Sequence, residues 1–346
     1  MPYMRRLQKV GAGTLTVSLP SRWVRAMGLA KGDVVEILEM PDGGLRVSTE
    51  GRAGGKRTAV TLDAAKFTDK DLLSRLVVGA YLQGSEEIRI ISGEGLSGEL
   101  QASVTEVLDM LPGVEVVEQT YRRVVIQSFV DPRRFPVEAL IKRIQVMLTT
   151  IINNLAEAAR TGRRELLHDI ERIENKLDEL YFLCVRQIFI DVKTKSHGEA
   201  APENYLTAIG DRLVVRALEE MADSVKMAAG ELMILEQVNV DEHLRRRIAK
   251  LIEPIQVLLG KTMKAFFSLD ASLANEVIET TRKEFGGHIS YSELFSAGNN
   301  DATLAIILRN IVWDMISVAR NCKIIAEVTL NRFVRTPSKL VELEIF

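Results

Sequence analysis

The chain has 346 residues, a formal net charge of −2 and a sequence pI of about 6.2. This length favours two or three domains, and a content of 47% hydrophobic and 27% charged residues is typical of globular proteins. A nearly neutral chain is not a nucleic-acid binder along its whole length, so any contact with DNA must be local.

The cysteine content predicts the cellular compartment. Cys184 and Cys322 lie far apart within helical patterns, which indicates buried free thiols in a reducing compartment rather than a disulfide framework or a metal set. No signal peptide opens the sequence, and no run reaches the apolar length of a membrane span. We therefore expect a cytoplasmic protein without membrane insertion.

The first segment, residues 4–28, predicts a strand, a tight turn, a second strand and a short helix. Apolar and polar residues alternate from Thr14 to Leu19, as in a half-buried strand, and Pro20 ends that strand. Ser21 is placed to cap the helix and Gly28 to close it. Positions 1–30 contain no Asp or Glu but five basic residues, which are Arg5, Arg6, Lys9, Arg22 and Arg25. A patch of one sign on a small β-rich domain suits a phosphate backbone.

The run QKVGAGTLTVSLPSRWVRAMGLAKGDVVEI resembles the swapped-hairpin DNA-binding domain of the AbrB/SpoVT/MazE type. The residues that carry the resemblance are Gly13, Val17, Leu19, Pro20, Trp23, Met27, Gly28, Leu29, Gly32, Asp33 and Val35. The resemblance implies an intertwined homodimer in which Arg5, Arg6, Lys9, Arg22 and Arg25 face DNA. The alternative is a β-barrel that only dimerises, because swapped hairpins also serve as antitoxin or scaffold modules.

Strands at 34–40 and 45–49, joined by a turn over Pro41–Gly44, complete this first domain at residues 1–50. The glycine-rich segment Gly51–Lys56 is a predicted linker.

Residues 57–130 predict a small α+β domain. We expect strands at 57–62, 86–91, 114–119 and 122–129, and helices at 69–83 and 97–110, with the last two strands paired antiparallel. Gly93–Gly98 spells G-x-G-x-x-G between a strand and a helix. It suggests either a nucleotide sensor or a turn that requires glycine, and the turn is favoured because the next strand folds back as a hairpin.

From residue 132 to 335 the pattern changes to long helices. We expect six of them, near 137–161, 163–195, 203–236, 241–268, 270–285 and 301–333, arranged as two three-helix halves.

Three of these helices resemble helices of PhoU-type phosphate regulators. The segments are RIENKLDELYFLCVRQI, VVRALEEMADSVKMAAGEL and LRNIVWDMISVARNCKIIAEVTLNR. An AbrB-type head, a mixed segment and a PhoU-like bundle occur in this order in archaeal-type phosphate-uptake regulators. The resemblance implies a non-enzymatic, DNA-binding regulator of phosphate homeostasis. The alternative is an adaptor without DNA binding that restrains a phosphate transporter or sensor kinase.

PhoU-type bundles carry an E/D-x-x-x-D motif that can bind a divalent metal or iron, and Glu219 and Asp223 match it. A helical wheel places both carboxylates on the surface, opposite the apolar stripe of their helix. The favoured alternative is a salt-bridge ladder with Arg212, Arg216 and Lys226, so no cofactor is certain.

Other positions give weaker signals. Glu171, Glu174 and Asp178 are interpreted as a solvated helix edge, although Glu174 and Asp178 share the four-residue spacing. In the second repeat the positions that match the motif are Ile316 and Arg320, which argues against a second metal cluster. Trp313, Ile316 and Ile324 make the outer face of the last helix partly apolar. We therefore expect this face to meet the α+β domain, a second subunit or a transporter component.

Overall fold

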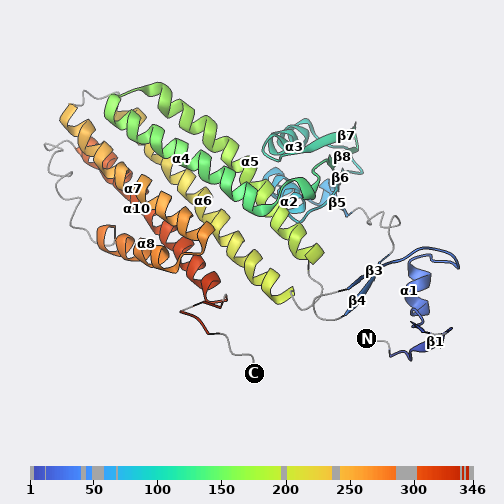
Figure 1. The fold of residues 1–346 in the computed structure, drawn as a ribbon. Coiled ribbons are helices and arrows are strands. Elements are labelled where there is room, and N and C mark those ends of the chain that lie inside the picture. The colour runs from blue at the N-terminus through green and yellow to red at the C-terminus, as the bar shows by residue number, and fades with distance from the viewer. Residues whose placement is uncertain are drawn as a thin grey trace. The chain divides into compact units, whose positions relative to one another are not determined.

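The computed structural model describes residues 4–11, 13–39, 44–48, 58–67, 69–195, 201–235, 242–285, 302–335, 337–338 and 340–342. They fall into two compact units, Met1–Thr58 and Ala59–Phe346 (Figure 1). The predicted linker Gly51–Lys56 and most of the predicted turn Pro41–Gly44 lie outside the described residues.

The first unit contains two antiparallel hairpins and one short helix. Its elements are β1 (Gln8–Val10), β2 (Thr14–Thr16), α1 (Ser21–Ala26), β3 (Glu36–Glu39) and β4 (Leu45–Ser48). β1 pairs with β2, and β3 pairs with β4. The order of elements confirms the prediction, but Ser21 is the first residue of α1 and not its cap: Pro20 occupies the cap position without a side-chain hydrogen bond. Gly28 follows the helix with φ of +62°, a conformation that favours glycine.

No described residue of this first unit is buried. Large apolar side chains are exposed on every strand or beside it, namely Leu7, Val10, Leu15, Val17, Ile37 and Leu45. Alternating strands normally bury one face, so this unit by itself lacks a surface on which to pack these side chains.

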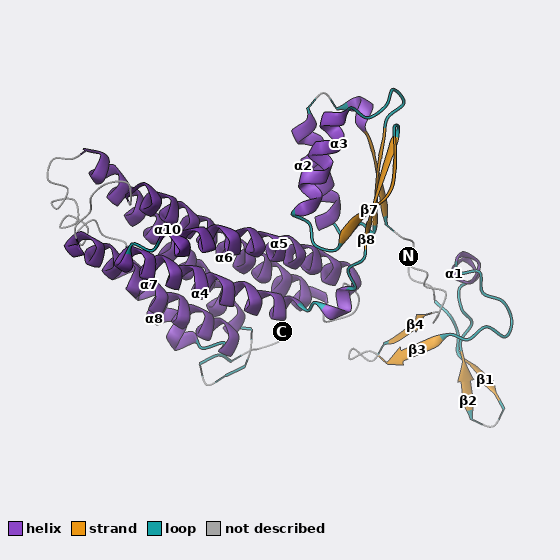
Figure 2. Cartoon of the chain, turned by 90° about the horizontal axis from the view of Figure 1, so that it is seen from above, coloured by secondary structure: helices purple, strands orange, loops and turns teal. Residues whose placement is uncertain are grey.

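The second unit begins with the predicted α+β domain. Its elements are β5 (Ala59–Asp63), α2 (Lys70–Leu82), β6 (Glu87–Ile91), α3 (Gly98–Asp109), β7 (Val114–Thr120) and β8 (Arg123–Ser128). The strand order is β5-β6-β8-β7; β5 and β6 are parallel and the other pairs are antiparallel. α2 and α3 lie on one face of this sheet (Figure 2). Alternate strand residues such as Ile88, Ile90 and Ile126 point into a core with Leu73 and Val77.

The G-x-G-x-x-G loop is filled by its own side chains and backbone. Gly95 has φ of +105°, and a Cβ atom there would lie 2.2 Å from the Tyr121 ring. The Tyr121 hydroxyl donates to the Glu94 carbonyl at 3.0 Å, and Ser97 caps α3. The geometry favours the turn that requires glycine over the nucleotide site.

All six predicted long helices are present, within a few residues of their expected ends. They are α4 (Val137–Thr161), α5 (Arg164–Lys195), α6 (Ala201–Leu235), α7 (Glu242–Ser268), α8 (Ala271–Glu284) and α10 (Ala302–Phe333). One continuous apolar core joins them and includes both cysteines as buried free thiols. α10 has the length and composition to cross a membrane, contrary to the prediction that no run does, but its apolar stripe lies in this core against α6, α7 and α8.

The α+β domain is attached to the bundle through α5. Arg186 of α5 is 2% exposed, and its guanidinium donates to the carbonyls of Tyr81 and Ser85 and to the Ser128 hydroxyl. These two carbonyls lie at the C-terminal end of α2, where a positive charge offsets the helix dipole. Phe182 contributes to both cores.

Candidate functional site

Four carboxylates of α5 and α6 gather where these helices pack together. Oxygen atoms of Glu174, Asp178 and Asp223 lie within 4.8 Å of one another. Glu219 joins them through its electrostatic interactions with Asp178 and Asp223. The four-residue spacing is the cause, because it places Glu174 with Asp178 on one face of α5 and Glu219 with Asp223 on one face of α6. We call these four residues the acidic cluster.

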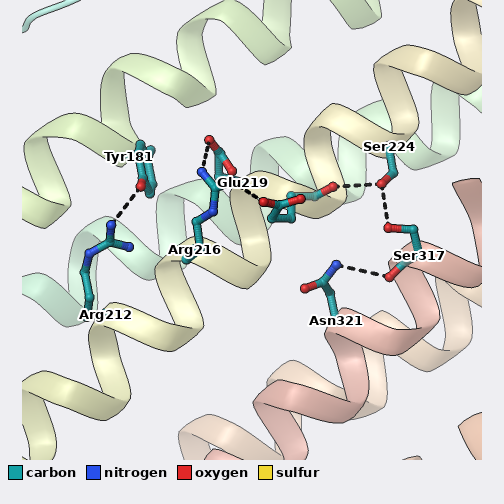
Figure 3. Close-up of polar contacts among 8 residues, drawn as sticks. Tyr181, Arg212, Arg216, Glu219, Ser224, Ser317 and Asn321 are labelled. Atoms are coloured by element: carbon teal, nitrogen blue, oxygen red, sulfur yellow. Dashed lines mark hydrogen bonds and ion pairs between the residues drawn. The ribbon is translucent and has the colours of Figure 1, made fainter. Parts of the chain in front are cut away.

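Two cations partly neutralise the acidic cluster. Lys226 Nζ lies 2.6 Å from Glu174 Oε2, and Arg216 Nη1 lies 2.9 Å from Glu219 Oε1. Arg212 donates instead to the Tyr181 hydroxyl at 3.1 Å (Figure 3). Arg216 also pairs with Glu220, so the carboxylates in this region outnumber its cations.

Burial controls the protonation of the acidic cluster. Loss of water contacts raises the pKa of Glu174 to about 7, against the opposing hydrogen bond from Lys226. Burial, and then the charge of Asp223, raises the pKa of Glu219 to about 7 and that of Asp178 to about 6. The helix interface therefore holds these negative charges at a cost that a bound cation would offset.

Two oxygens of the acidic cluster have no partner in the described part of the chain. Asp178 Oδ1 and Glu219 Oε2 are buried and accept no hydrogen bond. Buried acceptors are normally satisfied, and carboxylate oxygens are the ligands of hard cations. The residues present therefore fit a single hard cation held between α5 and α6.

The structure corrects two predictions about these acidic residues. Glu219 and Asp223 do not lie on the open surface: both are half-buried and face α5, and the Glu219 side chain is only 12% exposed. Glu174, predicted at a solvated edge, has a side chain that is 2% exposed. The helical wheel failed because it describes one helix at a time and cannot show that α5 covers this face of α6.

The predicted salt-bridge ladder forms in part. Arg216 pairs with Glu219 and Glu220 on α6, but Lys226 pairs across the helix interface with Glu174, and Arg212 makes no ion pair in the described residues. Glu174 and Asp178 are thus site residues that the sequence analysis set aside, although their E-x-x-x-D spacing was the signal for them.

The second repeat contains no equivalent group of three carboxylates in the described residues. In the sequence, Ile316 and Arg320 are the residues that we aligned with Glu219 and Asp223. Level with the acidic cluster, α6 and α10 are joined by neutral side chains, with Ser224 Oγ 3.0 Å from Ser317 Oγ, and Asn321 donates to the Ser317 carbonyl within α10 (Figure 3). On α10, Trp313 and Ile324 remain exposed, as predicted, whereas Ile316, the third residue of the predicted apolar face, is half-buried.

The five basic residues of the first unit are all exposed. Arg5 and Arg6 precede β1, Lys9 lies in it, and Arg22 and Arg25 lie three residues apart on one side of α1. None has an ion pair within the described residues. Exposed cations without an acidic partner are suited to phosphate groups.

Two family models match the chain. Residues 8–54 match the model described as antidote-toxin recognition MazE, bacterial antitoxin, and residues 141–230 match that of the PhoU domain. Among solved structures, the crystal structure of PhoU from Pseudomonas aeruginosa is 17% identical with a TM-score of 0.49, over 57% of this chain and 95% of that one. No curated protein matches the chain.

The fold defines a multidomain protein with a strand-rich head, a small α/β unit and a helical bundle. Within it, the two family matches identify a MazE/AbrB-like domain at the N-terminus and a PhoU domain in the bundle, as the sequence resemblance implied.

Proposed function

We propose that this protein is a cytoplasmic, non-enzymatic regulator of phosphate homeostasis that binds DNA through its first unit. The observation that carries the proposal is the set of five exposed, unpaired cations on a MazE/AbrB-like domain joined to a PhoU domain. DNA binding by such a set depends on phosphate charge and on release of counterions.

The proposal includes a homodimer. The apolar side chains of the first unit, such as Leu15 and Leu45, are 62% and 65% exposed in the single chain. A second copy of the same unit would cover them, as the swapped-hairpin resemblance implies. Dimerisation would also double the basic surface offered to one duplex.

Fluorescence anisotropy with a short duplex tests DNA binding. We expect Arg22→Ala and Arg25→Ala each to weaken binding by the full-length protein at low salt for every duplex sequence tested, because phosphate contacts carry no sequence information. Lys31→Ala is the matched control, since Lys31 is an exposed cation of the same unit outside the proposed set. Equal affinities of the wild type and both arginine variants would contradict the proposal.

We further propose that the acidic cluster is the input of the regulator and holds one divalent cation. When bound, the cation would supply positive charge to carboxylates that repel one another across the interface of α5 and α6. Asp178 and Asp223 would be its main ligands, because Glu174 and Glu219 already have cationic partners. Binding would strengthen the contact between the two helices.

Isothermal titration with Mn²⁺ tests the cation site. We expect one site per chain in the wild type and none in Asp223→Asn. Asp169→Asn is the control, because Asp169 lies on α5 in an exposed pair with Arg172. Equal binding of Mn²⁺ by Asp223→Asn and the wild type would contradict the cation site. The acidic residues would then serve only as members of a salt-bridge ladder.

The second candidate function is an adaptor that dimerises through its first unit and docks on a phosphate transporter or sensor kinase. It is favoured by one observation, the exposed apolar face of α10, where Trp313 is 58% and Ile306 is 57% exposed. This function predicts no DNA binding at low salt and co-purification with a membrane complex that is lost in Trp313→Ser.

A further inference from the structure

A cavity of about 440 Å³ lies at the end of the bundle where α10 finishes. Its apolar lining consists of Ile141, Phe266, Phe267 and Leu269, and two guanidinium groups, those of Arg332 and Arg335, also line it. This volume is within the range of small-molecule sites, which combine apolar walls with a few converging polar groups. The cavity is separate from the acidic cluster and shares no residue with it.

Arg332 is held in place but retains free donors. Its Nη2 donates to Asp211 Oδ1 at 2.7 Å and to the Thr207 carbonyl at 3.3 Å, and its guanidinium stacks on Phe266 at 4.6 Å. Nε is buried without a hydrogen-bond partner in the described residues. A guanidinium carries five N–H donors, and the side-chain hydrogen bonds of Arg332 in the described residues use only Nη2, so Nη1 still has donors for an acceptor that is not part of the chain.

Arg335 lies one turn after Arg332 and lines the same cavity. It is half-buried and has no ion pair within the described residues. Two neighbouring cations of which one is unpaired create a positive potential, and a carboxylate or phosphate group would satisfy both.

The three acidic groups at the cavity leave the charge of Arg335 without an acidic partner in the described residues. Glu138 is paired with Lys142 at 2.6 Å, Asp211 is paired with Arg332, and Glu203 is exposed, where water screens its charge. Glu138 and Glu203 lie in the first turns of α4 and α6, so the positive ends of two helix dipoles also lie beside the cavity.

The backbone beside the cavity is strained. Leu269 follows α7 with φ of +50°, a left-handed conformation at a position where helices usually carry glycine. Glycine would remove about 1 kcal/mol of strain there. The leucine side chain lines the cavity, which gives a reason for a larger residue at a position that disfavours it.

We propose that this cavity binds a small organic anion, with its carboxylate or phosphate monoester on Arg332 and Arg335 and its apolar body against Phe267 and Leu269. The proposal does not depend on DNA binding or on the cation site, so either can fail without the other.

Isothermal titration of the full-length protein with phenyl phosphate and with benzoate tests the proposal, and phenol serves as the uncharged analogue. We expect saturable binding of at least one anion at one site per chain, and binding at least about tenfold weaker for phenol. Binding of benzoate alone identifies a carboxylate site, and binding of phenyl phosphate alone identifies a phosphate monoester site.

Arg335→Met is the decisive variant, because it keeps an unbranched apolar side chain at a half-buried position and removes the charge. We expect it to weaken anion binding about tenfold or more, whereas Arg320→Met, on the same helix but stacked on Trp313, should have no effect. Leu269→Gly should remain folded and bind more weakly. Failure of both anions to bind, phenol binding as tightly as the anions, or Arg335→Met binding like the wild type would each overturn the proposal.

Discussion

Asp314 shows how burial of one carboxyl group affects the whole bundle. It lies half-buried on α10, and loss of water contacts, with a smaller contribution from the charge of Glu231 on α6, raises its pKa from 3.8 to about 7. Between pH 3.8 and about pH 7, Asp314 keeps its proton in the folded chain but has lost it in the unfolded chain. Stability from this residue is therefore complete below pH 4 and is lost as the pH rises through 7.

Asp314→Asn should flatten this pH dependence. We expect the melting temperature of the wild type to fall more between pH 5 and pH 8 than that of the variant, because the amide has no proton to lose. Glu327→Gln is the control, since Glu327 forms an exposed pair with Lys323. If the melting temperatures of the wild type and Asp314→Asn fall by the same amount between pH 5 and pH 8, the pKa of Asp314 is not raised.

At the scale of elements, Arg186 joins α5 to the C-terminal end of α2. Arg186→Met should destabilise this second unit by about 2–4 kcal/mol, because two carbonyls and a hydroxyl lose a buried, charged donor. Lys193→Met should cost less than about 0.5 kcal/mol, since Lys193 reaches the same end of α2 from an exposed position. Urea unfolding curves measure both, and equal effects would contradict the role of Arg186.

Two glycines within α6 provide a second test at this scale. Gly230→Ala should stabilise the protein by about 0.5–1 kcal/mol, because its Cβ would meet no atom within 4 Å and alanine favours a helix. At Gly210 the same Cβ would lie 3.2 Å from Arg332 Nη2 and from Val328 Cγ1. Gly210→Ala should therefore be less stable than Gly230→Ala by about 1–2 kcal/mol in thermal unfolding. A gain at Gly210 equal to that at Gly230 would show that Arg332 moves freely.

The spacing of apolar residues was sufficient to predict the long helices and the strands of the α+β domain. Each element is long enough for its apolar residues to repeat with the period of a helix or of a strand. The spacing could not show that α5 covers Glu219 and Asp223, since the wheel of one helix does not contain its neighbour. The prediction at Ser21 failed for a local reason, because Pro20 already supplies the extended conformation before the helix. The cavity beside Arg332 is lined by residues of four helices that are far apart in the sequence, so no local sequence pattern indicated it.

For the whole molecule, the proposed regulator requires the first unit to do two things. It must pair with a second copy to cover residues such as Leu15, and it must present Arg5, Arg6, Lys9, Arg22 and Arg25 to DNA. In this proposal the PhoU domain would respond to phosphate status, through the acidic cluster or a partner. A link between the two requires that an effector of the bundle has different affinities for the DNA-bound and free states.

The salt dependence of DNA affinity tests the central claim most directly. Fluorescence anisotropy of the full-length protein on a short duplex, across a series of salt concentrations, should give affinity that falls steeply and linearly on logarithmic axes. Removing one phosphate contact, as in Arg22→Ala, should reduce that slope by about 1. Absence of binding at low salt, or binding that salt does not change, would contradict a DNA-binding regulator and favour the adaptor.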